Sequence, residues 1–571
     1  MATPADVTEK PVIKLPEATQ HPRPQALAAL LLYAAASFAS FGSRVVGDFS
    51  HSYMAGSSPD PQLMVWSMAY WPHALSRLGD PLFTHVVWAP FGYNLAWATT
   101  VPLASVAMWP VTALFGPISS FNVLAIAAPA LAAWMAFLLC REVTHRFVPS
   151  LVGGYFFGFS SYMLAHLRGG HLNLVLVFLV PLFPLLALRR LRGQISSRRF
   201  LAATAAALIA QFLVSIEVFA TVVFFGAVAL TLAWGFDRAG LRPALVDVAR
   251  GAALAVALCA VVVSPFLFDA FARPAPVLTS DLIKGGTDAL NLFVPTRVTW
   301  LGGDRFASIS EPFWGQIAGQ AAYLGVVLIA IVIMFAVRAR GTFPGRFLAA
   351  FVAIAAVLSF GTVLHVGGHS SIPMPWIVAT PVPLLNRAVP NRFMLYCFLA
   401  VAVVVALVIA WAGRETPSRR AVAWALVVLA GISLAPARHY WDWGYTPTRP
   451  PFFADGMYRG YLGPDDVVAF FGPGQAALPM VWHAESGLAF RMANAYTGGH
   501  PADLPDSRLT NVLAQSGCPP AEVSPALRSF LADTGTTVVI VFENRGRECG
   551  SLQLGTTPLR VGGVDLYRLT G

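Results

Sequence analysis

Long apolar runs separated by short polar turns fill the first three quarters of the chain. A helix needs about 20 mostly apolar residues to cross the hydrocarbon core of a bilayer. One further run, 99–115, is shorter and contains Pro102 and Pro110. The pattern predicts a polytopic α-helical membrane protein with about eleven transmembrane helices, at 26–45, 122–140, 149–166, 173–189, 200–215, 218–235, 251–268, 320–337, 347–363, 392–411 and 421–436.

Arginine-rich turns predict the orientation of these helices. Short cationic loops face the cytoplasm. If 99–115 crossed, Arg141 and Arg146 would face outward or the first helix would be inverted. This run is therefore predicted to be re-entrant or interfacial. The N-terminus is then inside the cell and the C-terminus outside. The turns concerned are 141–146, 189–199, 237–250, 338–346 and 413–420.

The composition also indicates a membrane protein. Apolar residues make up 56% of the 571 residues and charged residues only 12%, about half the share found in soluble proteins. This leaves too little polar surface for a cytosolic enzyme, a disordered scaffold or a nucleic-acid binder. Loop charges that fix the topology explain the excess of 38 Lys and Arg over 28 Asp and Glu.

The sequence divides into three parts: a cytoplasmic N-terminal tail at 1–25, a membrane domain at 26–437, and an extracytoplasmic α/β domain at 438–571. The last part has the composition of a soluble module. Its pattern predicts a helix at 523–533 and strands at 466–471, 536–542 and 564–569.

Cysteine usage separates two environments. Cys518 and Cys549 lie in the outer tail, where oxidation is possible, and we expect them to form a disulfide. Cys140, Cys259 and Cys397 fall in apolar spans and are expected to be small buried hydrophobic residues. The spacing of the cysteines is not typical of a zinc site.

The predicted outer loops contain two candidate catalytic acids. Asp48 and Asp60 stand in the first loop, 46–121, on the same side as long loops at 269–319 and 364–390. Ionisable groups at the membrane edge are costly and therefore functional by default. Asp60 is either a catalytic base or the N-cap of the helix that follows it.

An interfacial helix is predicted at 61–79, directly after Asp60. Its apolar residues recur at helical spacing, and Trp66, Tyr70 and Trp71 would lie at the depth of the lipid headgroups.

Cationic groups are predicted on the same side. His166, Arg168 and His171 share a turn so short that their side chains are expected to face one outer cavity. Gly169 and Gly170 leave room for a ligand to approach the backbone closely. The alternative is a turn that only caps two helices.

Two further arginines, Arg387 and Arg392, flank the outer start of the span at 392–411. Their planar guanidinium groups suit phosphate, although both could instead be interface anchors. Glu311 stands beside aromatic rings that could stack on a sugar or form an aromatic belt. Glu217 is either a second acid or a charge favoured at a helix start. The segment 483–500 is rich in sugar-binding residue types and is either a lid or ordinary polar surface.

In its layout the chain resembles the GT-C superfamily of membrane glycosyltransferases. The motifs behind this resemblance are Asp-Pro-x-x-x-x-Trp at 60–66, GPISSFN at 116–122, FGFSSYMLAHLRGGHLN at 157–173 and VPNRF at 389–393. The resemblance covers about residues 1–440. It is nearest to the protein O-mannosyltransferase and aminoarabinose-transferase branches and to YfhO-type bacterial membrane proteins.

The resemblance implies a hexosyl- or pentosyltransferase of the plasma membrane. It would move a sugar from a polyprenyl-phosphate donor to an extracytoplasmic glycan, lipid or protein acceptor. Asp60, or else Asp48, would be the general base. The donor-binding residues would be His166, Arg168, His171, Glu311, Arg387 and Arg392. The sequence has no Asp-x-Asp pair, so no metal or other cofactor is expected.

The alternative function is a membrane transporter or flippase of a lipid or glycan precursor. Transporters usually have repeated halves and interrupted helices in corresponding positions. The sequence shows no such symmetry, and its polar residues are concentrated on one side. A non-catalytic assembly partner would keep the spans and the tail without needing the acid and the arginines.

The predicted disulfide can be tested with alkylating reagents. Cys518 and Cys549 should resist alkylation in the native chain and react after reduction, because each is the other's expected partner in an oxidising compartment. Closing a loop of about 30 residues should stabilise the tail by roughly 3–4 kcal/mol. Rapid labelling of both thiols in unreduced protein, read by mass spectrometry, would show that the bridge is absent.

Overall fold

A computed structural model provides the structure of the chain. It describes residues 23–56, 58–77, 79–237, 240–278, 285–313, 317–382, 385–437, 443–472, 477–504, 524–542 and 556–569. The predicted cysteine pair, Cys518 and Cys549, lies outside these residues.

A bundle of apolar helices forms the larger part of the molecule. Its members are α1 (Arg23–Ser40), α5 (Pro117–Thr144), α6 (Phe147–Gly158), α7 (Ser161–Arg168), α8 (Leu172–Val175), α9 (Leu182–Leu191), α10 (Ser197–Val214), α11 (Ile216–Phe236), α12 (Arg242–Val262), α13 (Ser264–Ala272), α15 (Val326–Ala339), α16 (Phe343–Ser359), α17 (Met394–Ala412) and α18 (Pro417–Ser433).

Six helical segments among the described residues are long and apolar enough to cross a membrane. They are Arg23–Arg44, Pro117–Thr144, Ser197–Val214, Ile216–Phe236, Arg242–Val262 and Pro390–Ala412. The last contains α17, which is apolar on every face and almost completely buried, as expected for the central helix of a bundle. Together with the shorter apolar helices α15 and α16, these segments make the chain a membrane protein. The count of eleven crossings stays a prediction.

Three predicted spans are not single helices. The span at 251–268 divides at Val263, between α12 and α13. The span at 149–166 breaks after α6, where Ser160 caps α7 by accepting a hydrogen bond from the Met163 backbone N–H. The span at 173–189 contains only the short α8 and the later α9, which begins after Pro181. A proline disfavours helical backbone in the residue before it, so the apolar run could not continue as one helix.

Small residues let α6 approach its neighbours closely. A Cβ added at Gly154 would come within 2.5 Å of the Ala133 carbonyl oxygen on α5, and one at Gly158 within 2.4 Å of the Pro129 carbonyl oxygen. On the side facing α17, a Cβ at Gly153 would come within 2.7 Å of the Ala402 carbonyl oxygen. Such backbone contact is how helices associate tightly in a lipid environment. It fixes the end of α6, and therefore the start of α7.

The first outer loop folds into short elements at one end of the bundle. It contains α2 (Asp60–Ser76), β1 (Phe83–Thr84), β2 (Tyr93–Asn94), α3 (Pro102–Ala107) and α4 (Trp109–Phe115). The predicted helix at 61–79 is therefore present as α2. Its aromatic residues Trp66, Tyr70 and Trp71 are buried in the protein, and the rings of Trp66 and Tyr70 stack with centroids 4.6 Å apart. Their expected position at headgroup depth stays a prediction.

The later loops add small elements, namely β3 (Val277–Leu278), α14 (Ala307–Ser310), β4 (Val363–Val366) and β5 (His369–Pro373). The C-terminal part contains α19 (Pro451–Ala454), β6 (Val467–Phe471), α20 (Leu478–Glu485), β7 (Arg491–Met492), β8 (Gly499–His500), α22 (Ser524–Asp533), β9 (Val538–Phe542), β10 (Leu559–Val561) and β11 (Val564–Arg568). The three strands and the helix predicted for this part are present.

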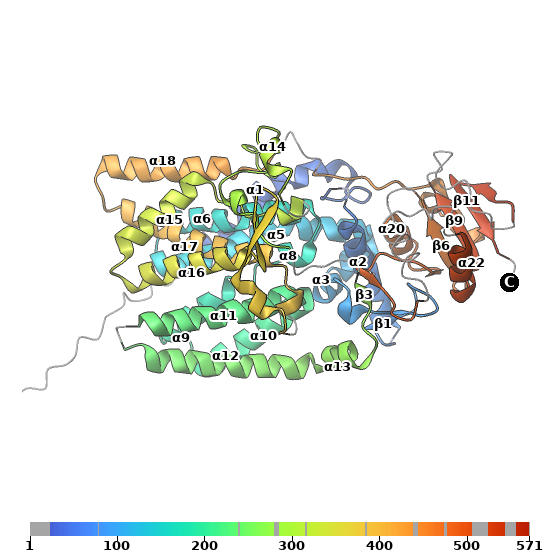
Figure 1. Ribbon diagram of the computed structural model, residues 1–571, viewed down its shortest axis with the longest axis horizontal. Coiled ribbons are helices and arrows are strands. Elements are labelled where there is room, and N and C mark those ends of the chain that lie inside the picture. The colour runs from blue at the N-terminus through green and yellow to red at the C-terminus, as the bar shows by residue number, and fades with distance from the viewer. Residues whose placement is uncertain are drawn as a thin grey trace, which may run out of the picture.

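The C-terminal sheet has the order β10-β11-β9-β6-β7. β6 pairs parallel with both β7 and β9, while the central β9 pairs antiparallel with β11. All residues of β6 and β9 are buried, as expected for strands covered on both faces. Figure 1 shows this sheet at one end of an elongated molecule, with α2 and α20 between it and the bundle.

Backbone pairing ties the C-terminal part to the outer loops. β3 pairs with β8, and Tyr53 forms an antiparallel bridge with Tyr445. The backbone N–H of Met492 donates to the Val86 carbonyl oxygen at 2.9 Å. The connection between α17 and α18 lies at the opposite end of the bundle (Figure 1). The predicted basic turn 413–420 and the C-terminal sheet are thus at opposite ends.

The topology can be tested with reporters at the two ends of α5. A reporter near residue 118 should lie outside and one near 145 inside, because 28 helical residues extend about 42 Å, more than the hydrocarbon core. The preceding α3 and α4 have only 6 and 7 residues, too few to cross. Fusions or accessibility labelling at both positions would check this, and an inside signal near 118 would contradict the orientation.

Candidate active site

Asp60 begins α2, and two other segments bind its carboxylate. His171 Nε2 lies 2.7 Å from Asp60 Oδ2, and the Tyr496 hydroxyl donates to Asp60 Oδ1 at 2.8 Å. The Asp60 side chain is 36% exposed and makes no capping hydrogen bond to α2. The N-cap interpretation is therefore wrong, because the carboxylate contacts side chains that are distant in sequence and not the backbone of α2.

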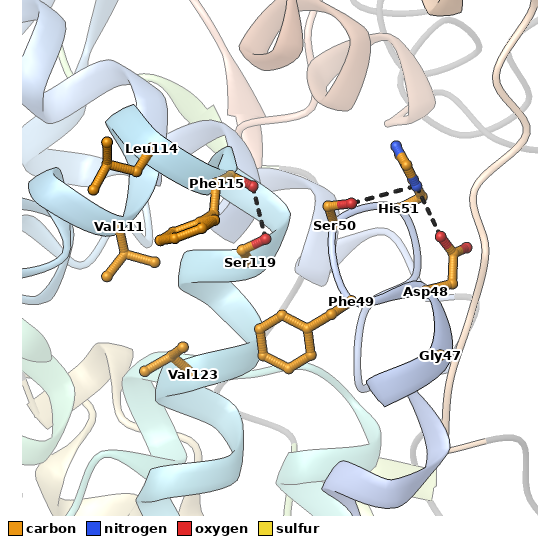
Figure 2. A pocket seen from close by; sticks show the side chains of 10 residues that line it. All are labelled: Gly47, Asp48, Phe49, Ser50, His51, Val111, Leu114, Phe115, Ser119 and Val123. Atoms are coloured by element: carbon orange, nitrogen blue, oxygen red, sulfur yellow. Dashed lines mark hydrogen bonds and ion pairs between the residues drawn. The ribbon is translucent and has the colours of Figure 1, made fainter.

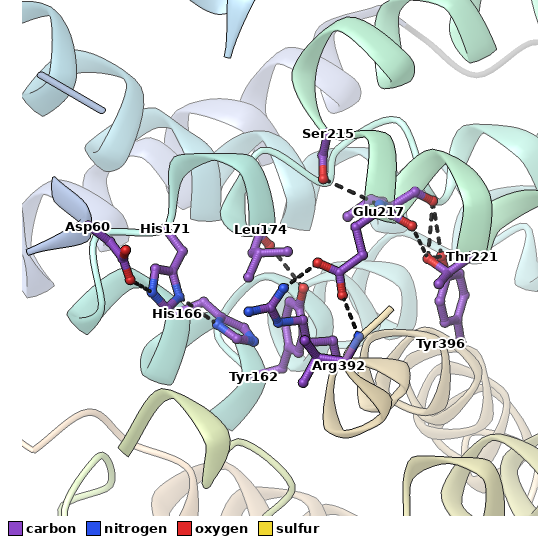
Figure 3. A network of polar contacts seen from close by, with 12 residues as sticks. Asp60, Tyr162, His166, His171, Leu174, Ser215, Glu217, Thr221, Arg392 and Tyr396 are labelled. Carbon is purple, nitrogen blue, oxygen red and sulfur yellow. Dashed lines mark hydrogen bonds and ion pairs between the residues drawn. The ribbon is translucent and has the colours of Figure 1, made fainter. Parts of the chain in front are cut away.

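A second histidine continues this contact into the bundle. His166 Nδ1 lies 3.1 Å from His171 Nδ1, so one ring donates to the other. An ionised carboxylate only accepts hydrogen bonds, which assigns a proton to His171 Nε2. The other nitrogen of His166, Nε2, is buried and has no hydrogen-bond partner among the described residues. Asp60, His171 and His166 form a continuous chain of polar groups (Figure 3).

The turn between α7 and α8 needs its glycines for packing. Gly170 has φ +70°, and a Cβ there would come within 2.2 Å of Pro61 Cγ. The space that the sequence suggested for a ligand at this glycine is therefore filled by the start of α2. Close contact between the turn and α2 is what brings His171 within reach of Asp60.

Arg168 lies beside the first outer loop. Its carbonyl oxygen accepts a hydrogen bond from the Gly56 N–H at 2.8 Å. A Cβ added at Gly56 would meet Arg168 Nη1 at 0.9 Å, so the guanidinium lies directly against that glycine. The three residues of the turn therefore point to two places: the histidines to Asp60, and the arginine to the segment before α2.

Arg392 forms an ion pair with Glu217. Glu217 lies in the first turn of α11 and also accepts a hydrogen bond from the Val389 backbone N–H at 2.9 Å. Both side chains are mostly buried, at 23% and 17% exposure. Both sequence interpretations of Glu217 lacked this partner, because the two residues are 175 positions apart.

These groups meet electrostatically at Asp60. Burial alone would raise the pKa of the Asp60 carboxyl, but the hydrogen bond and charge of His171, the Tyr496 hydroxyl and the charge of Arg392 hold this pKa below its ordinary value. The carboxyl is consequently ionised at neutral pH. Figure 3 shows the Arg392 guanidinium beside Glu217, toward the His166 side of the network.

The end of the bundle that faces the C-terminal part thus presents an ionised carboxylate, Asp60, and a guanidinium, Arg392, whose charge acts on it. Residues 29–435 match the family described as "Domain of unknown function (DUF6311)". The chain belongs to this family. A comparison with curated protein sequences gave no match.

Similarity to solved structures shows which fold this chain has. The apo oligosaccharyltransferase from Archaeoglobus fulgidus matches at TM-score 0.52 and 11% identity, over 91% of this chain and 70% of that one. The same organism's AglB, in complex with an inhibitory peptide and a dolichol-phosphate, matches at 0.51 and 13%, over 90% and 69%.

The mycobacterial arabinofuranosyltransferase AftD matches at TM-score 0.56 and 13% identity, over 97% of this chain but only 40% of its own length. The expected resemblance is confirmed at the level of the fold, which is that of GT-C membrane glycosyltransferases.

Asp48 stands apart from the Asp60 network. Its carboxylate accepts hydrogen bonds from His51 Nδ1 and the Ser52 hydroxyl, both at 2.8 Å. Asp48 and His51 line one side of a groove of about 920 Å³, whose opposite wall is formed by apolar side chains of α4 and α5, among them Leu114, Phe115 and Val123. Figure 2 shows the Asp48–His51 pair at the polar side of this groove.

Two predicted donor-binding residues have other partners. Glu311 pairs with Arg297 at 2.7 Å and is 61% exposed. The Arg387 guanidinium lies over the Trp97 ring, 5.6 Å from its centroid. Among the described residues, no hydrogen bond or ion pair connects either of them to Asp60. Of the predicted set, His171 contacts Asp60 directly, His166 contacts His171, and Arg392 acts on Asp60 through its charge.

Tyr496 is the site residue that sequence reasoning missed as a partner of Asp60. The sequence indicated only the segment 483–500, in which Tyr496 lies, as rich in sugar-binding residue types. The sugar-binding residue types of that segment, such as His483, Glu485 and Asn494, were a signal of function, but they could not indicate a contact across 436 positions.

The Glu217–Arg392 pair can be tested by stability. Glu217→Gln should destabilise the protein by about 1.5–3 kcal/mol, because it removes a charge-assisted hydrogen bond from a mostly buried arginine. Glu415→Gln is a matched control, since Glu415 pairs with the exposed arginines Arg338 and Arg419. Exposed pairs contribute less than about 1 kcal/mol. Unfolding in detergent measures both variants, and equal losses would contradict the structural role of the buried pair.

Proposed function

We propose that this chain is a glycosyltransferase that moves a sugar from a polyprenyl-phosphate donor to an extracytoplasmic acceptor, with Asp60 as general base. The observation that carries the proposal is the ionised Asp60 carboxylate, held by His171 and Tyr496 near Arg392. The GT-C fold supports this class of reaction. One solved relative with that fold is in complex with a dolichol-phosphate.

The reaction requires a proton acceptor. The acceptor hydroxyl attacks the anomeric carbon, the bond from that carbon to the donor phosphate oxygen breaks, and polyprenyl phosphate leaves with the electron pair. The hydroxyl proton passes to Asp60. A carboxylate with a lowered pKa is a weak base, but it is fully ionised and fixed at neutral pH, which suits proton removal late in an attack on a good leaving group.

The departing phosphate requires positive charge. Arg392 uses Nη1 for Glu217, and a guanidinium has five N–H donors in all. We assign the donor phosphate to Arg392, with Arg168 as a second cation from the turn after α7. His171 orients Asp60, and His166 supports His171. Preorganised donors at the place where charge develops lower the barrier more than donors recruited during the reaction.

Asp60→Asn tests the base. Asparagine keeps the shape of the side chain but cannot take a proton, so turnover should fall by about 10²–10⁴-fold while donor binding stays nearly unchanged. Turnover is measured as transfer of radiolabelled hexose or pentose from polyprenyl-phosphate donors to a membrane extract. Donor binding is measured with polyprenyl phosphate alone. If the variant lost folding and donor binding together while the surviving fraction kept normal specific activity, Asp60 would be structural.

Three companion variants sharpen this test. Arg392→Ala should weaken both donor binding and rate, because a ground-state phosphate contact is lost. Arg392→Lys keeps the charge but not the planar fork. Its donor binding and rate should therefore lie between those of the native chain and those of Arg392→Ala. Asp48→Asn compares the two candidate acids, and the larger loss of turnover identifies the base.

The same assay separates an enzyme from a transporter. A flippase would move the labelled donor across the bilayer and leave the bond between sugar and phosphate intact. Recovery of only intact donor from active vesicles would therefore contradict the proposed function.

A further inference from the structure

Tyr496 is the one C-terminal residue among those described that donates a hydrogen bond to Asp60. Its hydroxyl oxygen lies 2.8 Å from Asp60 Oδ1. Burial, and then the Asp60 charge, raise the pKa of Tyr496, so the phenol is protonated and donates. A residue of the C-terminal part therefore contacts the carboxylate that takes the proton in the proposed function.

The chain on either side of Tyr496 is held firmly. The Asn494 side chain makes hydrogen bonds to both the N–H and the carbonyl oxygen of Phe470 on β6, each at 2.9 Å. Thr497 accepts a hydrogen bond from Trp88 Nε1 at 2.9 Å, and its carbonyl oxygen accepts one from the Tyr93 hydroxyl at 3.2 Å. Tyr496 is thus fixed from two sides, as a positioning element requires.

A neighbouring contact fastens α2 to the same C-terminal segment. Trp66 Nε1 donates to His483 Nδ1 at 3.1 Å, and His483 Nε2 donates to the Phe490 carbonyl oxygen at 2.8 Å. Burial lowers the pKa of His483 to about 4, so the ring is neutral and keeps this pattern at physiological pH. The helix that begins with Asp60 and the segment that contains Tyr496 are therefore connected at two points.

The carboxylate still has room for an acceptor. Its two oxygens offer about four lone pairs. His171 occupies one lone pair on Oδ2 and Tyr496 one on Oδ1. The side chain is 36% exposed, so part of it is accessible from outside the protein. Two donors on different oxygens fix the carboxylate plane, which a single donor would leave free to rotate.

We propose that Tyr496 is a positioning residue for Asp60, and that the C-terminal segment 490–500 is therefore an integral part of the active site. The catalytic consequence rests on the proposed function. The contact itself predicts the ionisation of Asp60 whether or not the chain transfers a sugar. The charged or titratable groups that act on Asp60 are His171 with His166 behind it, Arg392 and Tyr496.

Tyr496→Phe removes the hydroxyl and keeps the ring. One hydrogen bond to the charged form of Asp60 is lost, so the pKa of Asp60 should rise by about one unit or more. Infrared spectroscopy can follow the band of the protonated Asp60 carboxyl against pH, identified by its absence in Asp60→Asn. In turnover, the acid limb of the pH–rate profile should move to higher pH, and kcat should fall roughly ten-fold with a smaller change in apparent donor KM.

Tyr70→Phe is the matched control. It removes a buried phenol hydroxyl from α2, where the hydroxyl donates to the Pro81 carbonyl oxygen at 3.1 Å, without touching Asp60 or the contacts that hold Tyr496. The control should leave the pKa of Asp60 unchanged, and it should lower kcat by less than Tyr496→Phe does. If the two variants titrate and turn over alike, Tyr496 has only a packing role and the inference is wrong.

Two other outcomes are distinguishable. Faster turnover or a lower apparent acceptor KM in Tyr496→Phe would mean that the phenol competes with the acceptor, which overturns positioning. If Asp60→Asn keeps normal turnover while Tyr496→Phe still shifts the Asp60 titration, the proposed function fails and the contact stands. If Asp60→Asn is inactive but Tyr496→Phe matches Tyr70→Phe, the proposed function stands and this inference fails.

Discussion

A carboxylate at the edge of a membrane bundle must be compensated, and the organisation of this chain follows from how Asp60 is compensated. Burial opposes its charge, and His171, Tyr496 and Arg392 reverse that effect. The first two lie 111 and 436 positions away in sequence. The fold must therefore bring a turn of the bundle, the first outer loop and the C-terminal part to one point, and each of the close contacts between these segments serves that geometry.

Close backbone packing makes this convergence possible. Gly154 and Gly158 let α6 lie against α5, and the helix then ends in the bundle instead of continuing through it. The short α7 and the turn after it bring His166 and His171 to the end of the bundle that faces the C-terminal part. Gly170 then allows Pro61 to approach, which sets the distance between His171 and Asp60. Small residues thus act on the site through helix packing, several contacts away from it.

The sequence predicted what depends on local pattern. The apolar runs, the helix after Asp60 and the strands of the C-terminal sheet are features of periodicity, and they are present. It failed where an apolar run was interrupted, as before Pro181, because hydropathy does not distinguish one spanning helix from two short ones. It did not predict that Trp66 is buried, because no local pattern shows that the C-terminal part covers α2.

The same distinction applies to the candidate site. The acid, the two histidines and Arg392 could be selected as residue types that are costly at a membrane edge, and they meet. Glu311 and Arg387 satisfied that criterion equally and have other partners, Arg297 and Trp97. Cost alone therefore identifies candidates but does not group them. Which candidates belong to one site depends on their contacts in the folded chain. A hydrogen bond such as that from Tyr496 to Asp60 arises from tertiary structure, and no spacing in the sequence predicts it.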